Sequence, residues 1–137
     1  PITVEQIDVL GSVGPVSIVE APNGIVPSHA DGGAGLTLVQ ATQGAENLSP
    51  LAVSDRLAEG VVPHFTDRAA RLLLSGGATA EAVLRAMGIS RLRLAGECLP
   101  GLGLASSEGR CIIAKSGGFG GPETLKTIAD MVLGRAI

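Results

Sequence analysis

The sequence predicts an α/β domain of the Rossmann-like, three-layer kind, with a mostly parallel sheet and helices on both faces. Short runs of leucine and β-branched residues alternate with segments of helical period, which is typical of such sheets. The 20 glycines and eight prolines gather between these runs and show no collagen-like period. With 137 residues, 45% of them hydrophobic, the chain can bury a sizeable core, so residues 1–137 are expected to form a single domain.

The first helix is predicted from about Val4 to Leu10, because Val4, Ile7 and Leu10 fall on one face. Thr3 is the expected N-cap, and Gln6 three residues later would complete a capping box. A helix that opens this close to the first residue indicates a piece of a longer protein.

Two strands and a second helix are predicted next. Val16–Glu20 is β-branched, and Leu36–Thr42 is apolar over most of its length, so both are expected to be strands. Residues 21–35 between them are rich in proline and glycine and are expected to be a loop. The pair Ser49-Pro50 predicts the start of a helix that ends near Pro63 or Phe65, because serine caps helices and proline suits the first helical position.

The C-terminal half is predicted to contain three strands and two helices. The strands are Arg71–Ser75, Arg91–Gly96 and Cys111–Ala114, and the helices are Thr79–Met87 and Pro122–Leu133. Parallel strands bring their carboxyl ends to one edge of a sheet, where ligands of α/β proteins bind. The loops that follow the first and the third of these strands are therefore candidate binding loops.

The first candidate loop is Ser75–Thr79, between a strand and a helix. Gly76 and Gly77 allow a sharp turn and a close approach of the backbone to a ligand. The helix N-terminus that follows favours a phosphate group. The alternative is a plain strand-to-helix turn with Thr79 as N-cap.

The second candidate loop is Lys115–Gly121, which has the same position after a strand. Lys115 supplies a cation, Ser116 a hydroxyl group and the glycines a backbone cradle for an anion. It is not a Walker A loop, because Ala114 rather than glycine precedes the lysine. The alternative is that Lys115 is a solvated surface residue.

Composition argues against other classes of function. Ten lysines and arginines against thirteen aspartates and glutamates give a net charge of −3, and the only aromatic residues are Phe65 and Phe119. Nucleic-acid binding therefore lacks both a basic excess and stacking side chains. No apolar run approaches the roughly 20 residues that span a bilayer.

Cysteine and histidine usage predicts no structural metal or disulfide scaffold. Cys98 and Cys111 are expected to be free thiols in a reducing, cytoplasmic setting. His29 and His64 have no zinc-ligand spacing and are expected on loops or the surface. Glu97, at the end of a predicted strand, either binds a metal or holds a loop by hydrogen bonds.

Four motifs follow one another in the order found in a known family. They are Ser75-Gly76-Gly77-Ala78-Thr79, Met87-Gly88-Ile89, Glu97-Cys98-Leu99-Pro100-Gly101 and Lys115-Ser116-Gly117-Gly118-Phe119-Gly120. The chain thereby resembles the C-terminal nucleotide-binding domain of the four-carbon acid sugar kinases, formerly a domain of unknown function. The family pattern is similar to G-G-[ED]-T, L-G-I, E-I-x-P-G-V-P and K-[ST]-G-[NG]-F-G. The likeness is good from about Ser54 onward and looser over residues 1–43.

The resemblance implies the ATP-binding half of a two-domain cytoplasmic kinase that uses ATP and Mg²⁺. An N-terminal domain absent from this chain would bind a threonate, erythronate or 3-oxo-tetronate type of sugar acid and supply the catalytic base. No catalytic residue is therefore assigned here, and the metal site is left open. The residues implied to bind nucleotide are Gly76, Gly77, Ala78, Thr79, Lys115, Ser116, Gly117, Gly118 and Gly120. Nucleic acid and membranes are not expected partners, and a homo-oligomer stays open.

Three departures from the family pattern keep an alternative open. Ala78 replaces an acidic residue, Gly103 replaces the second proline, and the serine expected before Pro1 is absent. The alternative is a non-catalytic nucleotide-binding module of the same fold, as in family members labelled type III effector Hrp-dependent.

Overall fold

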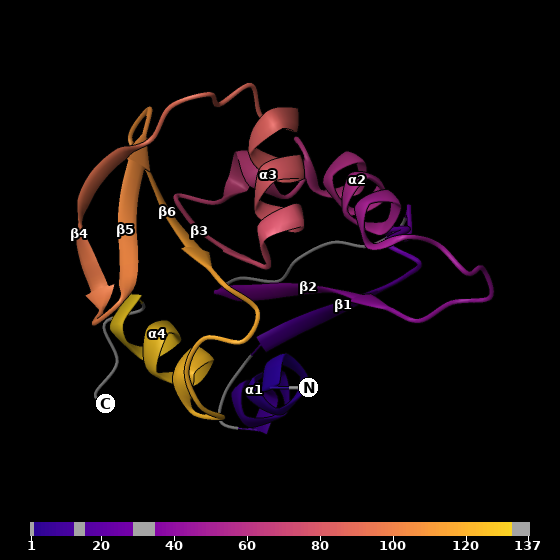
Figure 1. Ribbon diagram of the computed structural model, residues 1–137, viewed down its shortest axis with the longest axis horizontal. Helices are drawn as coiled ribbons and strands as arrows, with labels where there is room; N and C mark the ends of the chain where they lie inside the picture. Colours follow the sequence, from indigo (N-terminus) through magenta and orange to yellow (C-terminus); the bar gives the residue numbers. More distant parts are fainter. Residues whose placement is uncertain (1, 13–15, 29–34, 133–137) are drawn as a thin grey trace.

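The computed structural model describes residues 2–12, 16–28 and 35–132. Its elements, in chain order, are α1 (Ile2–Ser12), β1 (Val16–Pro22), β2 (Leu36–Thr42), α2 (Pro50–Val61), the 3₁₀ turn η1 (Thr66–Arg68), β3 (Arg71–Ser75), α3 (Gly77–Ala86), β4 (Arg93–Leu99), β5 (Leu102–Ser107), β6 (Arg110–Lys115) and α4 (Thr124–Val132). The chain is an α/β protein, as the sequence predicts. Figure 1 shows α1 and α4 on one side of the strands, and α2 and α3 on the other.

The sheet arrangement differs from the prediction of one mostly parallel, Rossmann-like sheet. β1 and β2 form a parallel pair, and the other described strands form a second sheet in the order β3-β6-β5-β4. In that second sheet only β3 and β6 are parallel, while β6–β5 and β5–β4 are antiparallel. The sheets are therefore short and mixed.

The physical reason is β5, a strand that the sequence analysis did not predict. It forms one hairpin with β4 before it and another with β6 after it. Glu108 and Gly109 between β5 and β6 have φ angles of 52° and 78°, the left-handed pair that a tight two-residue hairpin requires. Such a turn reverses the chain, whereas a parallel neighbour needs a long crossover connection.

Most other predicted elements are confirmed, with shifted ends. The β2 and β3 strands have the predicted bounds, and Ser49 caps α2 by accepting a hydrogen bond from the Ala52 amide at 3.2 Å. The helix α1 begins at Ile2, so Thr3 lies inside it and the predicted capping box is wrong. The predicted helix end at Leu133, together with Pro1 and His29, lies outside the described residues.

Three clusters of buried residues join the layers. The largest packs α2 and α3 against the strands and contains Leu57, Val61, Leu74, Val83 and Ile112. A second cluster joins α1 to α4 through Leu10, Leu125 and Ala129. The third cluster, of Leu102, Ile113 and Ile128, packs α4 on β5 and β6.

Candidate functional site

The two glycine loops lie side by side at the ends of β3 and β6. These strands are parallel neighbours, and Ser75 is paired with Lys115 at their last position. The pairing continues one residue further, because the Gly76 amide donates a hydrogen bond to the Lys115 carbonyl at 2.8 Å. Residues 75–79 and 115–120 therefore share one edge of the sheet.

The first loop ends in an uncapped helix N-terminus. Gly76 is the N-cap residue, with a φ of 97° and no side-chain hydrogen bond, and α3 begins at Gly77. The alternative in which Thr79 is the N-cap of a plain turn is therefore wrong, and the helix begins two residues before the predicted start at Thr79. The amides of Gly77, Ala78 and Thr79 belong to the first turn, where backbone N–H groups have no acceptor within the helix. Free amides and the dipole of a helix make such an N-terminus a favourable position for an anion.

The Thr79 side chain turns instead toward α2. Its Oγ1 atom lies 3.3 Å from Oγ of Ser54, which is buried. The sequence analysis missed Ser54, although a signal existed: Ser54 stands at the first position of the spacing i, i+3, i+4, i+7 that it shares with Leu57, Ala58 and Val61. A hydroxyl in an apolar stripe needs a polar partner, and Thr79 provides it.

Lys115 is buried, with only 2% of its surface exposed, which excludes the solvated alternative. Its Nζ donates to the carbonyls of Ser116 at 2.8 Å and Gly117 at 3.2 Å. Among the described residues no carboxylate pairs with it, and burial lowers the pKa of its ammonium group. An ammonium group has three donors, so one remains for a ligand.

The second half of the lysine loop is anchored to the protein at several points. Gly120 has a φ of 82°, and a Cβ there would collide with the Thr124 side chain. The Gly121 amide donates to Oγ1 of Thr124 at 2.9 Å. Phe119 packs on the buried cluster of Leu102, Ile113 and Ile128. The sequence analysis also missed Gln6 of α1, whose side-chain amide reaches this loop.

Glycines inside and outside the two candidate loops differ in whether the structure has room for a side chain. A Cβ at Gly77 or Gly118 would meet nothing within 4 Å, and neither residue has a positive φ. At Gly24 a Cβ would collide with the Val53 carbonyl, and at Gly44 it would overlap the Asn23 side chain. Gly77 and Gly118 are therefore free of a packing requirement, whereas Gly24 and Gly44 are structural.

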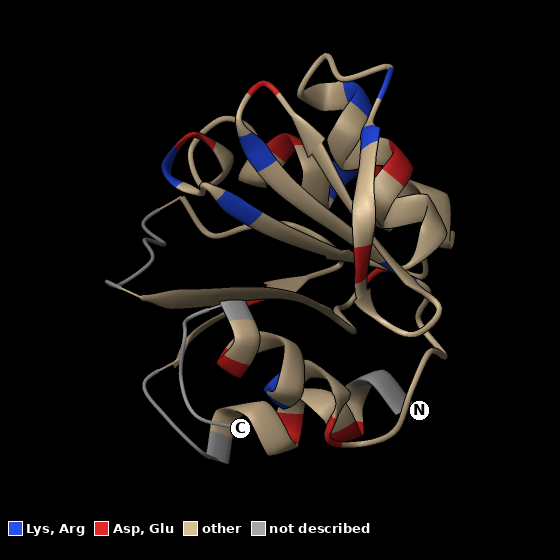
Figure 2. Cartoon of the chain, turned by 90° about the vertical axis from the view of Figure 1, so that its left-hand side faces the viewer, with Lys and Arg blue, Asp and Glu red and all other residues tan. Residues whose placement is uncertain are grey.

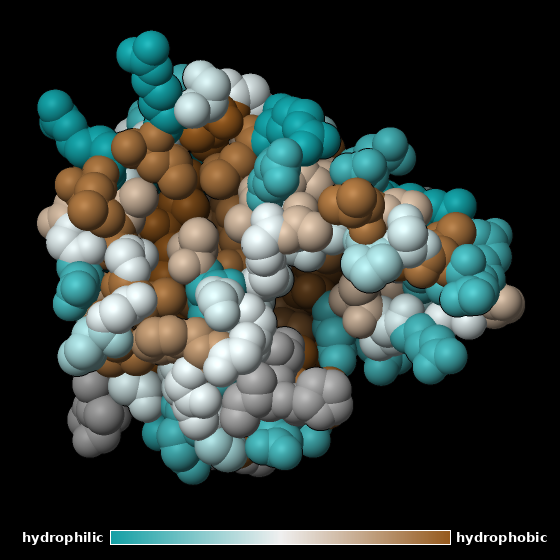
Figure 3. Space-filling model, in the orientation of Figure 1, coloured by the Kyte–Doolittle hydropathy of each residue, from teal (hydrophilic) through white to brown (hydrophobic). Residues whose placement is uncertain are grey.

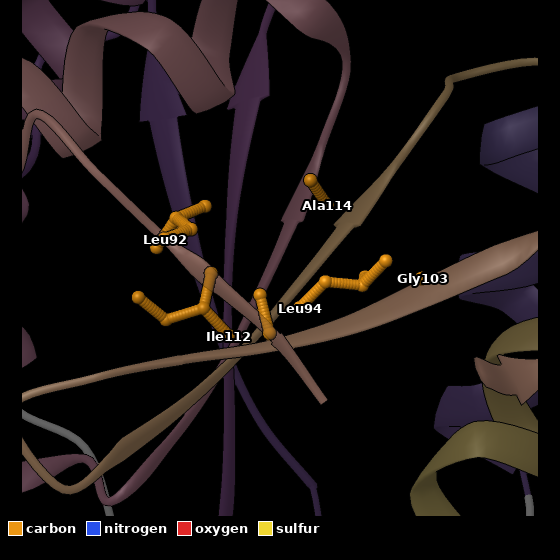
Figure 4. Close-up of a pocket in the computed structure, with 6 residues that line it drawn as sticks. Leu92, Leu94, Gly103, Ile112 and Ala114 are labelled. Atoms are coloured by element: carbon orange, nitrogen blue, oxygen red, sulfur yellow. The ribbon is translucent and has the colours of Figure 1, made fainter. Parts of the chain in front are cut away.

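An apolar hollow lies on one face of β4, β5 and β6. Its volume is about 290 Å³, and it is lined by Leu92, Leu94, Gly103, Ala105, Ile112 and Ala114. Figure 3 shows hydrophobic atoms gathered over these strands, and Figure 4 shows the lining side chains around one space. Ala114 directly precedes Lys115 on β6, and successive strand residues point to opposite faces of a sheet. The Lys115 side chain therefore lies on the other face from the hollow.

The described residues contain no group of three or more His, Cys, Asp or Glu side chains that could hold a metal. Glu97 is exposed on β4, and His64 is exposed with its ring against the Phe65 ring. Cys98 and Cys111 are free thiols, and burial and the neighbouring Cys111 raise the pKa of Cys98. Charges of both signs are interspersed on the face in Figure 2.

Comparison with known families identifies the domain. Residues 25–125 match the family described as the nucleotide-binding C-terminal domain. The match covers most of the chain, which therefore belongs to this family. The resemblance to the C-terminal nucleotide-binding domain of the four-carbon acid sugar kinases is confirmed.

Solved structures share the fold. A domain of unknown function from Bordetella bronchiseptica, crystallised with citrate as a domain-swapped dimer, is 23% identical and superposes with a TM-score of 0.73 over 99% of this chain and 39% of that one. A Haemophilus influenzae protein of the same domain family is 15% identical, with a TM-score of 0.66 over 95% of this chain and 37% of that one. The chain thus spans less than two fifths of either protein.

A search of curated proteins finds no match. In the part of the chain that the structure describes, no helix has the length and apolarity needed to cross a membrane.

Proposed function

We propose that the chain is the ATP-binding domain of a kinase that phosphorylates four-carbon sugar acids of the threonate, erythronate or 3-oxo-tetronate type. The phosphates would lie between the Gly76–Thr79 turn and the Lys115–Gly120 loop. The observation that carries the proposal is the buried ammonium of Lys115, which has no carboxylate partner among the described residues; the backbone of Lys115 is hydrogen-bonded to Gly76, the N-cap residue of α3. A phosphate would supply the missing negative charge.

The chemistry of phosphoryl transfer fits such a site. It requires positioning and charge neutralisation more than covalent catalysis. Lys115 would neutralise phosphate oxygens, the amides of Gly77, Ala78 and Thr79 would orient them, and Ser116, Gly117, Gly118 and Gly120 would close the cradle. The catalytic base and the sugar-acid site would belong to another domain.

Mg²⁺ is not held by these loops alone. They offer an ammonium group, hydroxyls and amides, whereas Mg²⁺ is usually bound through one or two carboxylates together with substrate phosphates. Ala78 stands where the family carries an acidic residue. We therefore assign no metal ligand to this chain, and Mg²⁺ would enter only as its nucleotide complex.

Substitutions in the two loops test the proposal. Lys115→Ala is expected to weaken ATP binding about tenfold or more, because a charge-assisted hydrogen bond is lost. Gly77→Ala and Gly118→Ala are expected to weaken it comparably while leaving the free energy of unfolding nearly unchanged, because each added methyl meets only the ligand. Isothermal titration calorimetry and chemical denaturation measure the two quantities.

Gly11→Ala is the matched control, because its Cβ would make an ordinary contact with Ile18 at 3.4 Å, outside both loops. NMR shift mapping with ATP provides a second readout. Perturbed amides confined to residues 21–28, with residues 76–79 and 115–120 unaffected, would contradict the site.

The second candidate is a non-catalytic nucleotide-binding module, which Ala78 favours. It predicts that a full-length protein binds ATP without transferring phosphate, whereas the kinase proposal predicts transfer to a sugar acid.

A further inference from the structure

Gln6 of α1 reaches the lysine loop through its side-chain amide. Its side chain is completely buried, which is unusual for a glutamine on a helix of the outer layer. It comes from the opposite end of the chain, more than a hundred residues before the loop that it contacts. The contact is therefore a product of the complete fold.

The side-chain amide of Gln6 spans one residue of the loop. Its Nε2 donates to the carbonyls of Phe119 and Gly121, both at 2.9 Å. Gly120 lies between these two carbonyls and has the left-handed φ of 82°. Both donors of one rigid amide thus hold the loop at the point where the backbone turns back toward α4.

Gln6 contributes less to stability than two hydrogen bonds suggest. Its Oε1 is buried and has no partner among the described residues. A buried acceptor without a partner costs free energy that offsets the donated bonds. The residue therefore acts mainly on the shape of the loop.

The two halves of the loop are held by different donors. Lys115 Nζ holds the carbonyls of Ser116 and Gly117, and Gln6 holds those of Phe119 and Gly121. A phosphate would compete for Nζ, because an anion is the stronger acceptor for an ammonium group. The Gln6 bonds compete with nothing in the site and would keep the loop in place.

We propose that Gln6 is a positioning residue for the phosphate-binding loop, and this inference rests on the proposed function. It holds residues 116–121 in the shape that presents their backbone amides to the phosphates. It does not itself touch the nucleotide.

Gln6→Met tests the role, because methionine keeps the length of the side chain and removes both donors and the orphan acceptor. We expect ATP and tripolyphosphate to bind about tenfold more weakly, with little change in the free energy of unfolding. Hydrogen exchange of amides 116–121 should become faster. Leu10→Ala is the control: it destabilises α1 through the α1–α4 core and should leave both affinities unchanged.

Gln6→Glu gives a second, independent measurement. An ionised glutamate cannot donate to the two carbonyls, whereas a protonated one donates once. Affinity for tripolyphosphate should therefore be weak near neutral pH and recover partly at acidic pH, relative to the wild type at each pH.

Two results would overturn the inference: unchanged affinity in Gln6→Met, or an equal loss in Leu10→Ala. Where Gln6→Met does not fold, a Gln6→Glu variant that binds like the wild type at neutral pH overturns it. Failure of the proposed function is distinct, because the wild type itself would then bind neither ATP nor tripolyphosphate.

Discussion

Lys115 keeps its ammonium group buried against two backbone carbonyls, and no carboxylate of the described part of the chain pairs with it. Burying a charge without a counter-ion opposes folding, because the group loses its hydration. The same desolvation strengthens the attraction of the group for a phosphate, because it acts in a less polar medium. A residue that costs stability in the free protein thus becomes favourable when an anion is bound.

The lowered pKa of Lys115 predicts a dependence on pH. Between that pKa and the ordinary value of 10.5 the unfolded chain binds the proton that the folded chain has released. The free energy of unfolding therefore rises with pH across this window. Below the window, the folded chain carries the full cost of burying a charged ammonium group. ATP affinity should change in the opposite direction, because phosphate binds only the charged lysine.

Calorimetric titrations at a series of pH values from about 7 to about 10 check this. The affinity of the wild type should fall with rising pH toward that of Lys115→Met, which should bind weakly at every pH. A wild-type profile parallel to that of Lys115→Met would contradict the role of the ammonium group.

At the scale of elements, Asn23 closes the corner after β1. Its backbone amide donates to the Thr42 carbonyl at 2.9 Å, and its side-chain Oδ1 accepts from the backbone amide of Gly44 at 3.1 Å. The residue is buried and has a φ of 54°. The corner thus continues the pairing of β1 with β2 beyond its last register position, Pro22 with Thr42.

Asn23→Ala is expected to destabilise the protein by about 2 kcal/mol, because it loses the hydrogen bond to Gly44 and places alanine in the left-handed region. Asn23→Gly should be less destabilising by roughly 1 kcal/mol, because glycine adopts this φ without strain. Urea denaturation of the two variants measures the difference. Equal losses would show that the φ angle does not matter there.

The same elements show what local sequence patterns can predict. Strand, glycine turn and helix are properties of short segments, so the ends of β3 and β6 and both candidate loops were predictable. β5 was missed because Gly103 and two serines weaken its strand pattern, although the Glu108-Gly109 turn was a signal for a hairpin. The contacts of Gln6 and Ser54 join distant segments, and no local pattern encodes them.

At the scale of the whole molecule, the candidate site depends on parts from every layer. Gln6 comes from α1, Ser54 from α2, and the two loops from the ends of β3 and β6. The site is therefore assembled from segments that lie far apart in the sequence.

The chain itself is expected to bind ATP without transferring phosphate to a four-carbon sugar acid. Among the described residues, no carboxylate or imidazole is hydrogen-bonded to Lys115, Ser54 or Thr79, so no general base stands at the loops. The chain also spans only 39% of the Bordetella bronchiseptica protein, which leaves room for a separate substrate domain in proteins of that length. ADP release with threonate or erythronate should equal the release without sugar acid, in a sample shown by calorimetry to bind ATP. Sugar-acid-dependent turnover that disappears in Lys115→Ala would place the complete active site within these 137 residues and contradict the two-domain proposal.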